Sequence, residues 1–142
     1  MSLEDRILES EGWRNTVYKD TLGLRTIGVG HLITKDDFPF KEGVEYPKEQ
    51  LMDLFKQDLE KAHKGAIQVV GHIKDLPREI WGVVVEMIFQ LGPTGVSRFK
   101  KFIKSLEEKD YHEAHLQMKD SRWHKQTKNR CEKLAEIVRS HA

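Results

Sequence analysis

The chain has 142 residues, of which 33% are charged and 38% hydrophobic, and its formal net charge is +1. These values are typical of a globular domain with a real core and exclude a disordered or fibrous chain. The single cysteine excludes an intrachain disulfide, and no hydrophobic run approaches the roughly 20 residues that a membrane-spanning helix needs.

Apolar side chains at helical spacing predict a first helix over residues 3–11. Gly12 follows, and glycine is the usual residue just past a helix end because it enters the left-handed region without penalty. Glu11 is therefore expected at the end of this helix rather than on its solvated flank. Residues 1–10 are charged and lack a signal-peptide pattern, so we expect synthesis in the cytoplasm without self-export.

A small antiparallel sheet is predicted for residues 12–34. Alternation at residues 16–18 indicates a first strand, residues 20–23 form a turn signal, and a second strand is expected over residues 24–27. A helix end followed by a hairpin can bring side chains of both elements to one cleft.

Glu11, Asp20 and Thr26 are suited to splitting a glycosidic bond, which needs an acid for the leaving oxygen and a second carboxylate. Glu11, near Trp13 and the helix end, could keep its proton in a desolvated site, while Asp20 on a turn would stay ionised. The Thr26 hydroxyl could hold a water beside Asp20. Spacing alone is weak support, because most of the 23 Asp and Glu residues are expected to be solvated surface groups.

The remaining chain is predicted to be helical after a loop at residues 34–47. A helix from about 48 to 66 is long enough to connect two lobes. Pro77 begins a helix that is apolar on nearly every side, belongs at the centre of the larger lobe and stops near Gly92. Three consecutive valines in it also suit a strand, but its length and its proline start favour a helix.

Five shorter helical segments follow, at about 94–98, 100–108, 110–119, 121–126 and 128–140. Their candidate core residues are Leu106, Tyr111, Leu116 and Trp123. Cys131, on the last segment, is predicted to be a small core or boundary residue rather than a nucleophile.

The charge is unevenly distributed along the chain. Residues 97–142 hold 12 Lys or Arg against 7 Asp or Glu, a net charge of +5, so the first 96 residues carry −4. A basic C-terminal region suits an anionic polymer such as bacterial cell wall or nucleic acid. A Lys-rich helix surface without any such partner accounts for the same count.

The segment from Glu11 to His31 has the frame E-x8-D-x5-T-I-G-x-G-H, which resembles the catalytic signature of the phage-type lysozymes, glycoside hydrolase family 24, and especially of their T-even phage members. FQLGPTGVSRF, residues 89–99, resembles the family's FQMG-x-TGV-x-x-F segment, and DSRWHKQTKNR, residues 120–130, resembles its SRW-x-x-QT-x-NR segment. Three blocks in the family's order make coincidence implausible.

This resemblance implies an α+β, mainly α fold with the two-lobed lysozyme architecture. A single lysozyme domain would cover residues 1–142, with a small sheet lobe at about 12–48 and a linking helix at about 48–66. The helical lobe would comprise residues 67–142 together with the helix at 3–11. The loop at 34–47 is shorter than in the T-even members, so the rim of the small lobe is expected to differ.

The resemblance also implies an endolysin that hydrolyses the β-1,4 bond between N-acetylmuramic acid and N-acetylglucosamine in peptidoglycan, with inversion. Glu11 would be the general acid, and Asp20, helped by Thr26, the general base. No cofactor or metal is needed, and the partner is a peptidoglycan glycan strand rather than nucleic acid. We expect a monomer without stable membrane insertion that leaves the host cytoplasm through a holin lesion and acts in the periplasm.

Further positions match the family's supporting and substrate-contact residues. His31 and Asp58 are expected to form an ion pair that raises the pKa of the histidine, although a strand-end histidine without a partner is the alternative. Arg130 matches an arginine that reaches toward the catalytic glutamate, and is interpreted as a positioning group. The cleft-wall positions are Leu32 and Phe89, and Gln90 could bind a sugar acetamido group; judged without the family, each of the three favours a core position over a substrate contact. Two contact positions have changed, to Phe102 and Gln117.

Two other activities compete with this interpretation. A lytic transglycosylase needs an acid but no water-activating carboxylate, so Asp20 and Thr26 count against it. A catalytically silent binding protein for polysaccharide or nucleic acid would use the basic C-terminal helices. His112 and His115 superficially resemble a zinc motif, but they are three apart where the metalloprotease helix needs four, and no third ligand is apparent.

Overall fold

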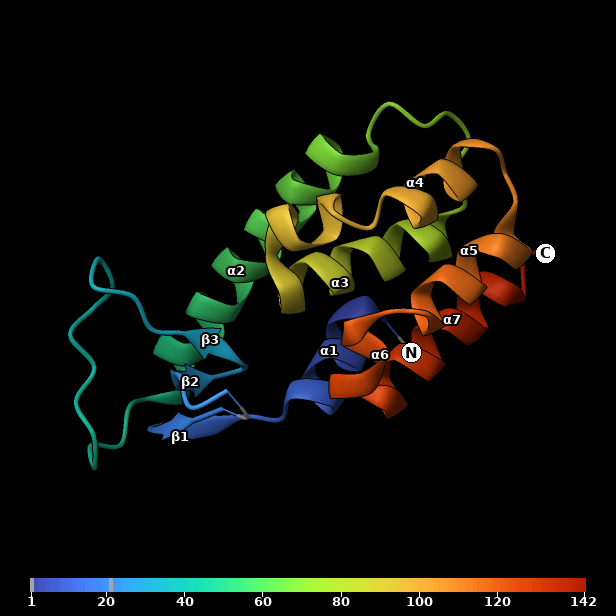
Figure 1. The fold of residues 1–142 in the computed structure, drawn as a ribbon. Coiled ribbons are helices and arrows are strands. Elements are labelled where there is room, and N and C mark those ends of the chain that lie inside the picture. The colour runs from blue at the N-terminus through green and yellow to red at the C-terminus, as the bar shows by residue number, and fades with distance from the viewer. Residues whose placement is uncertain (1, 21) are drawn as a thin grey trace. The chain divides into compact units, whose positions relative to one another are not determined.

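A computed structural model describes residues 2–20 and 22–142. Within these residues the chain forms seven helices and one three-stranded antiparallel sheet (Figure 1), which confirms the predicted α+β, mainly α fold class. The chain divides into two compact units, which we call unit 1, up to Glu60, and unit 2, Lys61–Ala142. Unit 1 holds α1 and the sheet, whereas the sequence placed residues 3–11 with the helical part.

Helix α1 spans Leu3–Glu11, as predicted. The Ser2 side chain caps its start by accepting a hydrogen bond from the Asp5 N–H at 3.1 Å. Gly12 ends it with φ 69° and donates its N–H to the Leu8 carbonyl at 2.8 Å. These two caps make Glu11 the last helical residue.

The sheet contains β1 (Arg14–Lys19), β2 (Arg25–Gly28) and β3 (His31–Leu32), in that order and all antiparallel (Figure 1). The second strand lies one residue later than predicted. In the register Tyr18 faces Thr26, which in turn faces Leu32. An irregularity in the β1–β2 pairing lies between Arg14 and Tyr18.

The turn after β1 is closed by hydrogen bonds between the Asp20 N–H and the Leu24 carbonyl and between the Gly23 N–H and the Asp20 carbonyl, each 2.9 Å long. Thr21, part of the predicted turn signal, lies outside the described residues. The predicted loop at residues 34–47 has no helix or strand. The small core of unit 1 contains the buried side chains Ile27, Phe40 and Leu51 with the partly buried Val17, Ile33, Tyr46 and Leu54.

Helix α2 spans Lys48–Val70 and so continues four residues beyond the predicted end at about residue 66. Ala66 and Val70 are buried, at 0% and 1% exposure. This extra turn therefore carries its own buried face, and burial stabilises a further turn more than local propensity does. Its exposed Ile67 and the Gly that follows Val70 obscured the periodicity in the sequence.

Helix α3 spans Arg78–Ser97 directly after Pro77, as the sequence predicted. Gly92 has non-helical dihedrals (φ 79°, ψ 159°) and Pro93 follows it, so the segment expected separately at about 94–98 continues beyond a kink. By length and composition α3 could cross a membrane, but its residues 83–85 and Met87 are fully buried in unit 2, as expected for a core helix.

Four helices complete unit 2: α4 (Lys100–Glu107), α5 (Tyr111–Lys119), α6 (Arg122–Gln126) and α7 (Lys128–Arg139). Helix α5 packs on α4 and α7, and α7 also packs on α3 and α6. Leu106, Trp123 and Cys131 are buried as predicted, and burial raises the pKa of the Cys131 thiol to about 12, which makes it unreactive. Tyr111 is only half-buried.

Leu116 was wrongly predicted to be a core residue, since its side chain is 41% exposed. The buried face of α5 consists of Ala114, His115 and Met118. Leu116 lies two residues from Ala114 and Met118, and such residues do not share a helix face.

His115 is 5% exposed, and neither of its ring nitrogens has a hydrogen-bond partner. Its ring lies edge to face with His112, at a centroid separation of 5.1 Å. Burial lowers the pKa of His115, and so do the nearby His112, Lys119 and Arg139, while Glu136 opposes them. The folded chain therefore holds a neutral imidazole in its α5–α7 packing. No group of three potential metal ligands occurs among the described residues.

His115→Leu should raise the free energy of unfolding by about 1–3 kcal/mol at pH 7, because it removes two buried polar atoms without partners. A lowered folded pKa means that the unfolded chain binds the proton first, so the wild type loses stability as pH falls below about 6.5. Urea unfolding between pH 4 and 8 should show a weaker acid dependence in the variant. The half-buried His63→Leu is the control, and an equal acid dependence in wild type and His115→Leu would contradict the prediction.

Candidate active site

Glu11 ends α1 with its carboxylate against the backbone of Gly30. A Cβ atom added at Gly30 would lie only 1.9 Å from Glu11 Oε2, and Gly30 has φ +65°. Only glycine leaves room for this approach and also adopts the dihedral without strain. Trp13, expected to desolvate Glu11, is 38% exposed and lies 5.9 Å from the Lys48 ammonium group in a cation–π contact.

Asp20 follows β1 directly, and its orientation is set by the turn that it begins. Its Oδ1 accepts hydrogen bonds from the N–H groups of Leu22 and Leu24, both at 2.9 Å. Such bonds from a side chain to the following backbone are typical of aspartate in turns. They occupy one carboxylate oxygen, Oδ1, and so fix the orientation of the carboxylate.

Thr26 is 3% exposed and donates its hydroxyl hydrogen to the Leu24 carbonyl at 2.9 Å. The same carbonyl accepts the Asp20 N–H. The Leu24 peptide groups therefore connect two of the three predicted catalytic residues. The Thr26 hydroxyl already donates its hydrogen to the Leu24 carbonyl, so it can only accept a hydrogen bond from a water. It can therefore hold the water expected from the sequence as an acceptor and not as a donor.

Tyr18 lies beside Thr26 in the sheet, although it was not among the site residues predicted from the sequence. It faces Thr26 across the sheet. Its pKa is raised by burial first and then by the Glu11 and Asp20 carboxylates, against an opposing effect of Arg14. Both carboxylates thus oppose ionisation of the Tyr18 phenol. Its place two residues before Asp20 in an alternating strand was the available signal.

His31 is 9% exposed and lies between two carboxylates. Its Nδ1 is 2.6 Å from Asp58 Oδ2, as predicted, and its Nε2 is 3.1 Å from Asp37 Oδ2, which the sequence did not reveal. The alternative of an unpartnered histidine is wrong. Burial alone would lower the pKa of His31, but Asp58 and Asp37 together raise it.

Asp37 also anchors the loop that follows β3. Its Oδ2 accepts the Thr34 N–H at 2.6 Å and the Thr34 hydroxyl at 3.1 Å. Although burial opposes the charged carboxylate, these hydrogen bonds and the histidine hold the pKa of Asp37 below its usual range. One loop residue thereby joins β3 and α2 through His31 and Asp58.

In unit 2, Arg130 donates from Nε to Glu86 Oε2 at 3.0 Å. Glu86 is 1% exposed in the otherwise apolar centre of α3. A buried carboxylate needs a cation as its partner. A single glutamate within an apolar helix was therefore the signal in the sequence that such a pair exists. The predicted approach of Arg130 to Glu11 remains a prediction.

The predicted substrate contacts have different surroundings. Leu32 is 47% exposed beside Thr26, and Phe89 is half-buried. The Gln90 amide is engaged within unit 2, where its oxygen accepts the Trp123 indole N–H at 2.9 Å and its nitrogen donates to the Thr127 hydroxyl at 3.2 Å. Gln90 retains one donor hydrogen and one lone pair for a sugar.

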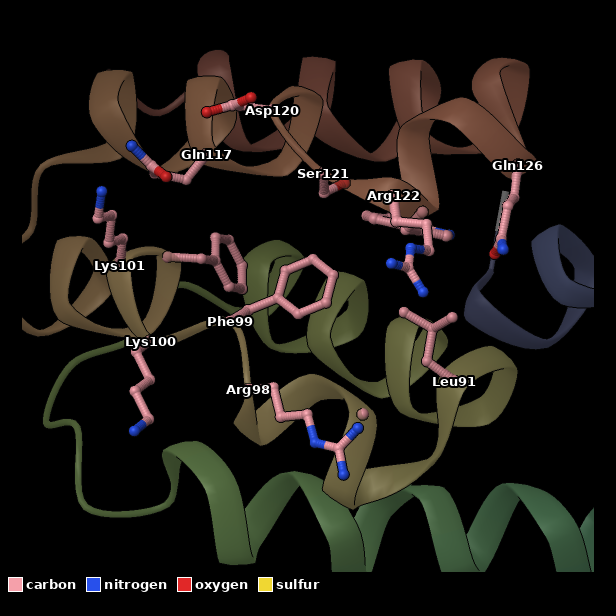
Figure 2. Close-up of a pocket in the computed structure, with 13 residues that line it drawn as sticks. Leu91, Arg98, Phe99, Lys100, Lys101, Gln117, Asp120, Ser121, Arg122 and Gln126 are labelled. Atoms are coloured by element: carbon pink, nitrogen blue, oxygen red, sulfur yellow. The ribbon is translucent and has the colours of Figure 1, made fainter.

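A pocket of about 560 Å³ lies within unit 2 (Figure 2). Phe99 lies at its centre, with α3 and α4 on one side and α5 and α6 on the other. The charged residues of its lining are Arg98, Lys100, Lys101, Asp120 and Arg122. Its apolar floor and excess of cations suit an anionic ligand with an apolar part. Phe102 and Gln117, the two changed contact positions, line this pocket.

Comparisons with known proteins agree with the sequence blocks. A family model described as phage lysozyme matches residues 8–141. Probable T4-type lysozymes 2 and 1 of Dictyostelium discoideum are each 30% identical over 159 residues, covering 96% of this chain and 92% and 93% of those proteins. The pre-baseplate central spike protein Gp5 of Enterobacteria phage T4 is 28% identical over 165 residues, covering 97% of this chain and 28% of that protein.

His31→Gln should lower the free energy of unfolding by roughly 3 kcal/mol near pH 5 to 6, because it leaves two carboxylates without their cation. A raised folded pKa means that the contribution of His31 is complete below about pH 6.5 and is lost as pH rises through the folded value. Asp37 contributes above its unfolded pKa of 3.8 and loses this contribution in acid. Urea unfolding at several pH values should therefore show that the variant loses the most unfolding free energy between pH 3.8 and about pH 6.5.

His72→Gln is the control, since His72 pairs with Glu107 on the surface, where ion pairs contribute little. A His31→Gln deficit that stays constant up to pH 9 would show that the charge of His31 is not what stabilises unit 1.

Proposed function

The chain belongs to the phage lysozyme family, and on this premise we propose that it cleaves the β-1,4 bond between N-acetylmuramic acid and N-acetylglucosamine with inversion. It is a lysozyme-type glycoside hydrolase, and its substrate is peptidoglycan. The observation that carries the finer proposal is the arrangement in unit 1, where Glu11 rests on Gly30 and Leu24 holds both Asp20 and Thr26.

In the proposed reaction Glu11 is the general acid. Its proton passes to the glycosidic oxygen as the bond from that oxygen to the sugar C1 breaks, and Glu11 is left as a carboxylate. The contact with Gly30 supports this role, because it prevents the acid from moving toward the sheet.

Asp20 is the general base in this proposal. Its Oδ2 takes a proton from a water that attacks C1 on the face opposite the leaving group, while the backbone of Leu22 and Leu24 holds Oδ1. The Thr26 hydroxyl oxygen accepts a hydrogen bond from the second hydrogen of that water, which stays on the attacking oxygen. Bulk water then returns the proton from Asp20 to Glu11.

Inversion requires room for the water, with carboxyl groups about 6.5–9.5 Å apart, whereas a covalent retaining route needs about 5 Å. Two features favour a water positioned for attack on the sugar. The turn orients the Asp20 carboxylate, and the Thr26 hydroxyl has lone pairs that can accept a hydrogen bond from the water. They also count against a lytic transglycosylase, which uses no water-activating group.

We further propose that the enzyme is a monomeric endolysin, made in the host cytoplasm and released to the periplasm through a holin lesion, where it causes lysis. The match to 28% of a baseplate spike protein supports the alternative of delivery within a particle. Neither role requires nucleic acid, a cofactor or stable membrane insertion.

The charge distribution favours an anionic polymer as the partner. Unit 2 has 16 Lys or Arg against 10 Asp or Glu, a net charge of +6, and unit 1 has 8 against 13, a net charge of −5. Peptidoglycan carries carboxylates, so the cationic pocket of unit 2 fits the same substrate. A silent binding protein would use the same surface, and only catalysis separates the two functions.

Glu11→Gln should abolish turbidity loss of outer-membrane-permeabilised Gram-negative cells, lowering the rate at least 10²–10⁴-fold, because the amide cannot donate the proton. Asp20→Asn should lower it similarly. NMR of the anomeric proton in freshly released fragments should show the α-anomer first, as inversion of a β bond requires. Lysis by well-folded Glu11→Gln at the wild-type rate would refute the assignment of Glu11, and a β-anomer first would refute inversion.

Gly30→Ala should reduce activity about 10²-fold, because its Cβ would displace the Glu11 carboxylate. The matched control is Gly43→Ala, which has a similar dihedral of φ +80° but no atom within 4 Å of the added Cβ. Both variants should lose similar stability in thermal unfolding, and only Gly30→Ala should lose turnover. Equal activity in the two variants would show that this contact does not position Glu11.

A further inference from the structure

The pocket of about 560 Å³ in unit 2 takes no part in the proton transfers of the proposed reaction (Figure 2). All of its lining residues lie between Leu91 and Gln126, so it belongs to unit 2 alone. Sites for small molecules have volumes of about 300–1,000 Å³ and are lined mainly by apolar and aromatic side chains with a few polar groups. This pocket is therefore large enough for a ligand of its own.

The floor of the pocket is made of aromatic rings. The Phe99 ring lies edge to face with those of Phe102 and Trp123, at centroid separations of 6.5 and 6.2 Å. Phe102 and Trp123 are 1% and 3% exposed, whereas Phe99 is half-buried, so part of its side chain stays accessible. Phe102 is one of the two changed contact positions, and its ring offers no hydrogen-bonding group to a sugar. Such a floor favours an apolar ligand group.

Four cations of the lining surround this floor: Arg98, Lys100, Lys101 and Arg122. All four are exposed, and within the described residues none of their side chains forms an ion pair or a hydrogen bond. Asp120 is the only carboxylate among the described lining residues, which gives the lining a net charge of +3. Figure 2 shows Arg98, Lys101 and Arg122 on different sides of the Phe99 ring. An anionic group over this ring would therefore be attracted from several directions.

The uncharged polar side chains of the lining are mostly engaged within the protein. The Ser121 hydroxyl donates to the Met118 carbonyl at 2.6 Å and accepts the His124 N–H at 3.1 Å. The Gln117 amide nitrogen donates to Glu113 at 2.8 Å. A sugar ring carries several hydroxyl groups, and each costs free energy when it is buried without a partner. The pocket therefore suits a sugar poorly, whereas an alkyl chain needs no such partners.

We propose that this pocket is a binding site for a single-chain amphiphilic anion, whose alkyl chain packs on the aromatic floor and whose anionic headgroup is bound by Arg98 and Lys101. Binding is noncovalent, so no proton or electron is transferred. The hydrolytic residues belong to unit 1, and the inference does not depend on the proposed function. Peptidoglycan carboxylates would be attracted to the same cations, so competition with peptidoglycan is part of the test.

Decanoate, kept below its micellar concentration, is the probe for the full chain. Calorimetric titration should show saturable binding. Octanoate, shorter by two CH₂ groups, should bind about 15-fold more weakly, because each buried CH₂ contributes about fourfold in affinity. Acetate, which has the charge without the chain, should not bind. In NMR spectra the indole N–H resonance of Trp123 should shift on binding, while that of Trp13 in unit 1 should not.

Arg98→Gln/Lys101→Gln should weaken decanoate binding about tenfold and leave binding of the uncharged 1-decanol unchanged, because only the headgroup contacts are lost. The matched control is Lys61→Gln/Lys133→Gln, which removes the same charge from exposed positions of unit 2 outside the lining and should change neither affinity. Gly95→Met should weaken binding of both probes, because an added Cβ there has only one lining side chain within 4 Å and the longer side chain fills part of the pocket.

Absence of saturable decanoate binding would overturn the proposal, as would an unmoved Trp123 resonance or equal weakening in the two double variants. Binding to phosphatidylglycerol vesicles without binding of decanoate would also overturn it, since the ligand would then be a bilayer surface. Displacement of decanoate by soluble peptidoglycan fragments would assign the pocket to the substrate instead. Glu11→Gln should bind decanoate like the wild type, so a failure of the proposed function would leave this result standing.

Discussion

The backbone of Leu24 holds together two of the three side chains on which the proposed chemistry depends. Its carbonyl accepts hydrogen bonds from the Asp20 N–H and the Thr26 hydroxyl, and its own N–H donates to the Asp20 carboxylate. The geometry of one tight turn therefore positions both the proposed base and the hydroxyl proposed to bind water. Glu11 meets the same sheet at a different turn, between β2 and β3, where its carboxylate approaches Gly30 and a side chain at position 30 would prevent that approach.

Buried charges in each unit are matched to partners from other segments. His31 is placed between Asp37 and Asp58, and Arg130 pairs with the buried Glu86. Such pairs contribute little net stability, but a missing member leaves an uncompensated buried charge, so they favour one arrangement over others. They therefore fix the local arrangement within each unit more than they add to the stability of the fold. His115 is the contrast, because it is buried without a hydrogen-bond partner and remains neutral.

Local signals predicted most of the helices and strands because their caps and turns are encoded within a few residues. Gly12 ends α1 and Pro77 precedes α3, as read from the sequence. The errors arose where burial decides: α2 continues to Val70 because that residue is buried, and Leu116 is exposed because α5 buries a different face. Periodicity indicates that a helix has an apolar face, but its neighbours decide which residues that face contains.

By itself, the sequence determined the fold class, the family and the candidate catalytic residues, because these follow from motifs and short-range patterns. Only the tertiary structure showed that Asp37 joins Asp58 at His31, that Arg130 pairs with Glu86, and that Tyr18 faces Thr26 across the sheet. These contacts join residues from separate elements, so no spacing along the chain reveals them. Pairing across space is set by strand register and helix packing, which depend on the whole of each unit.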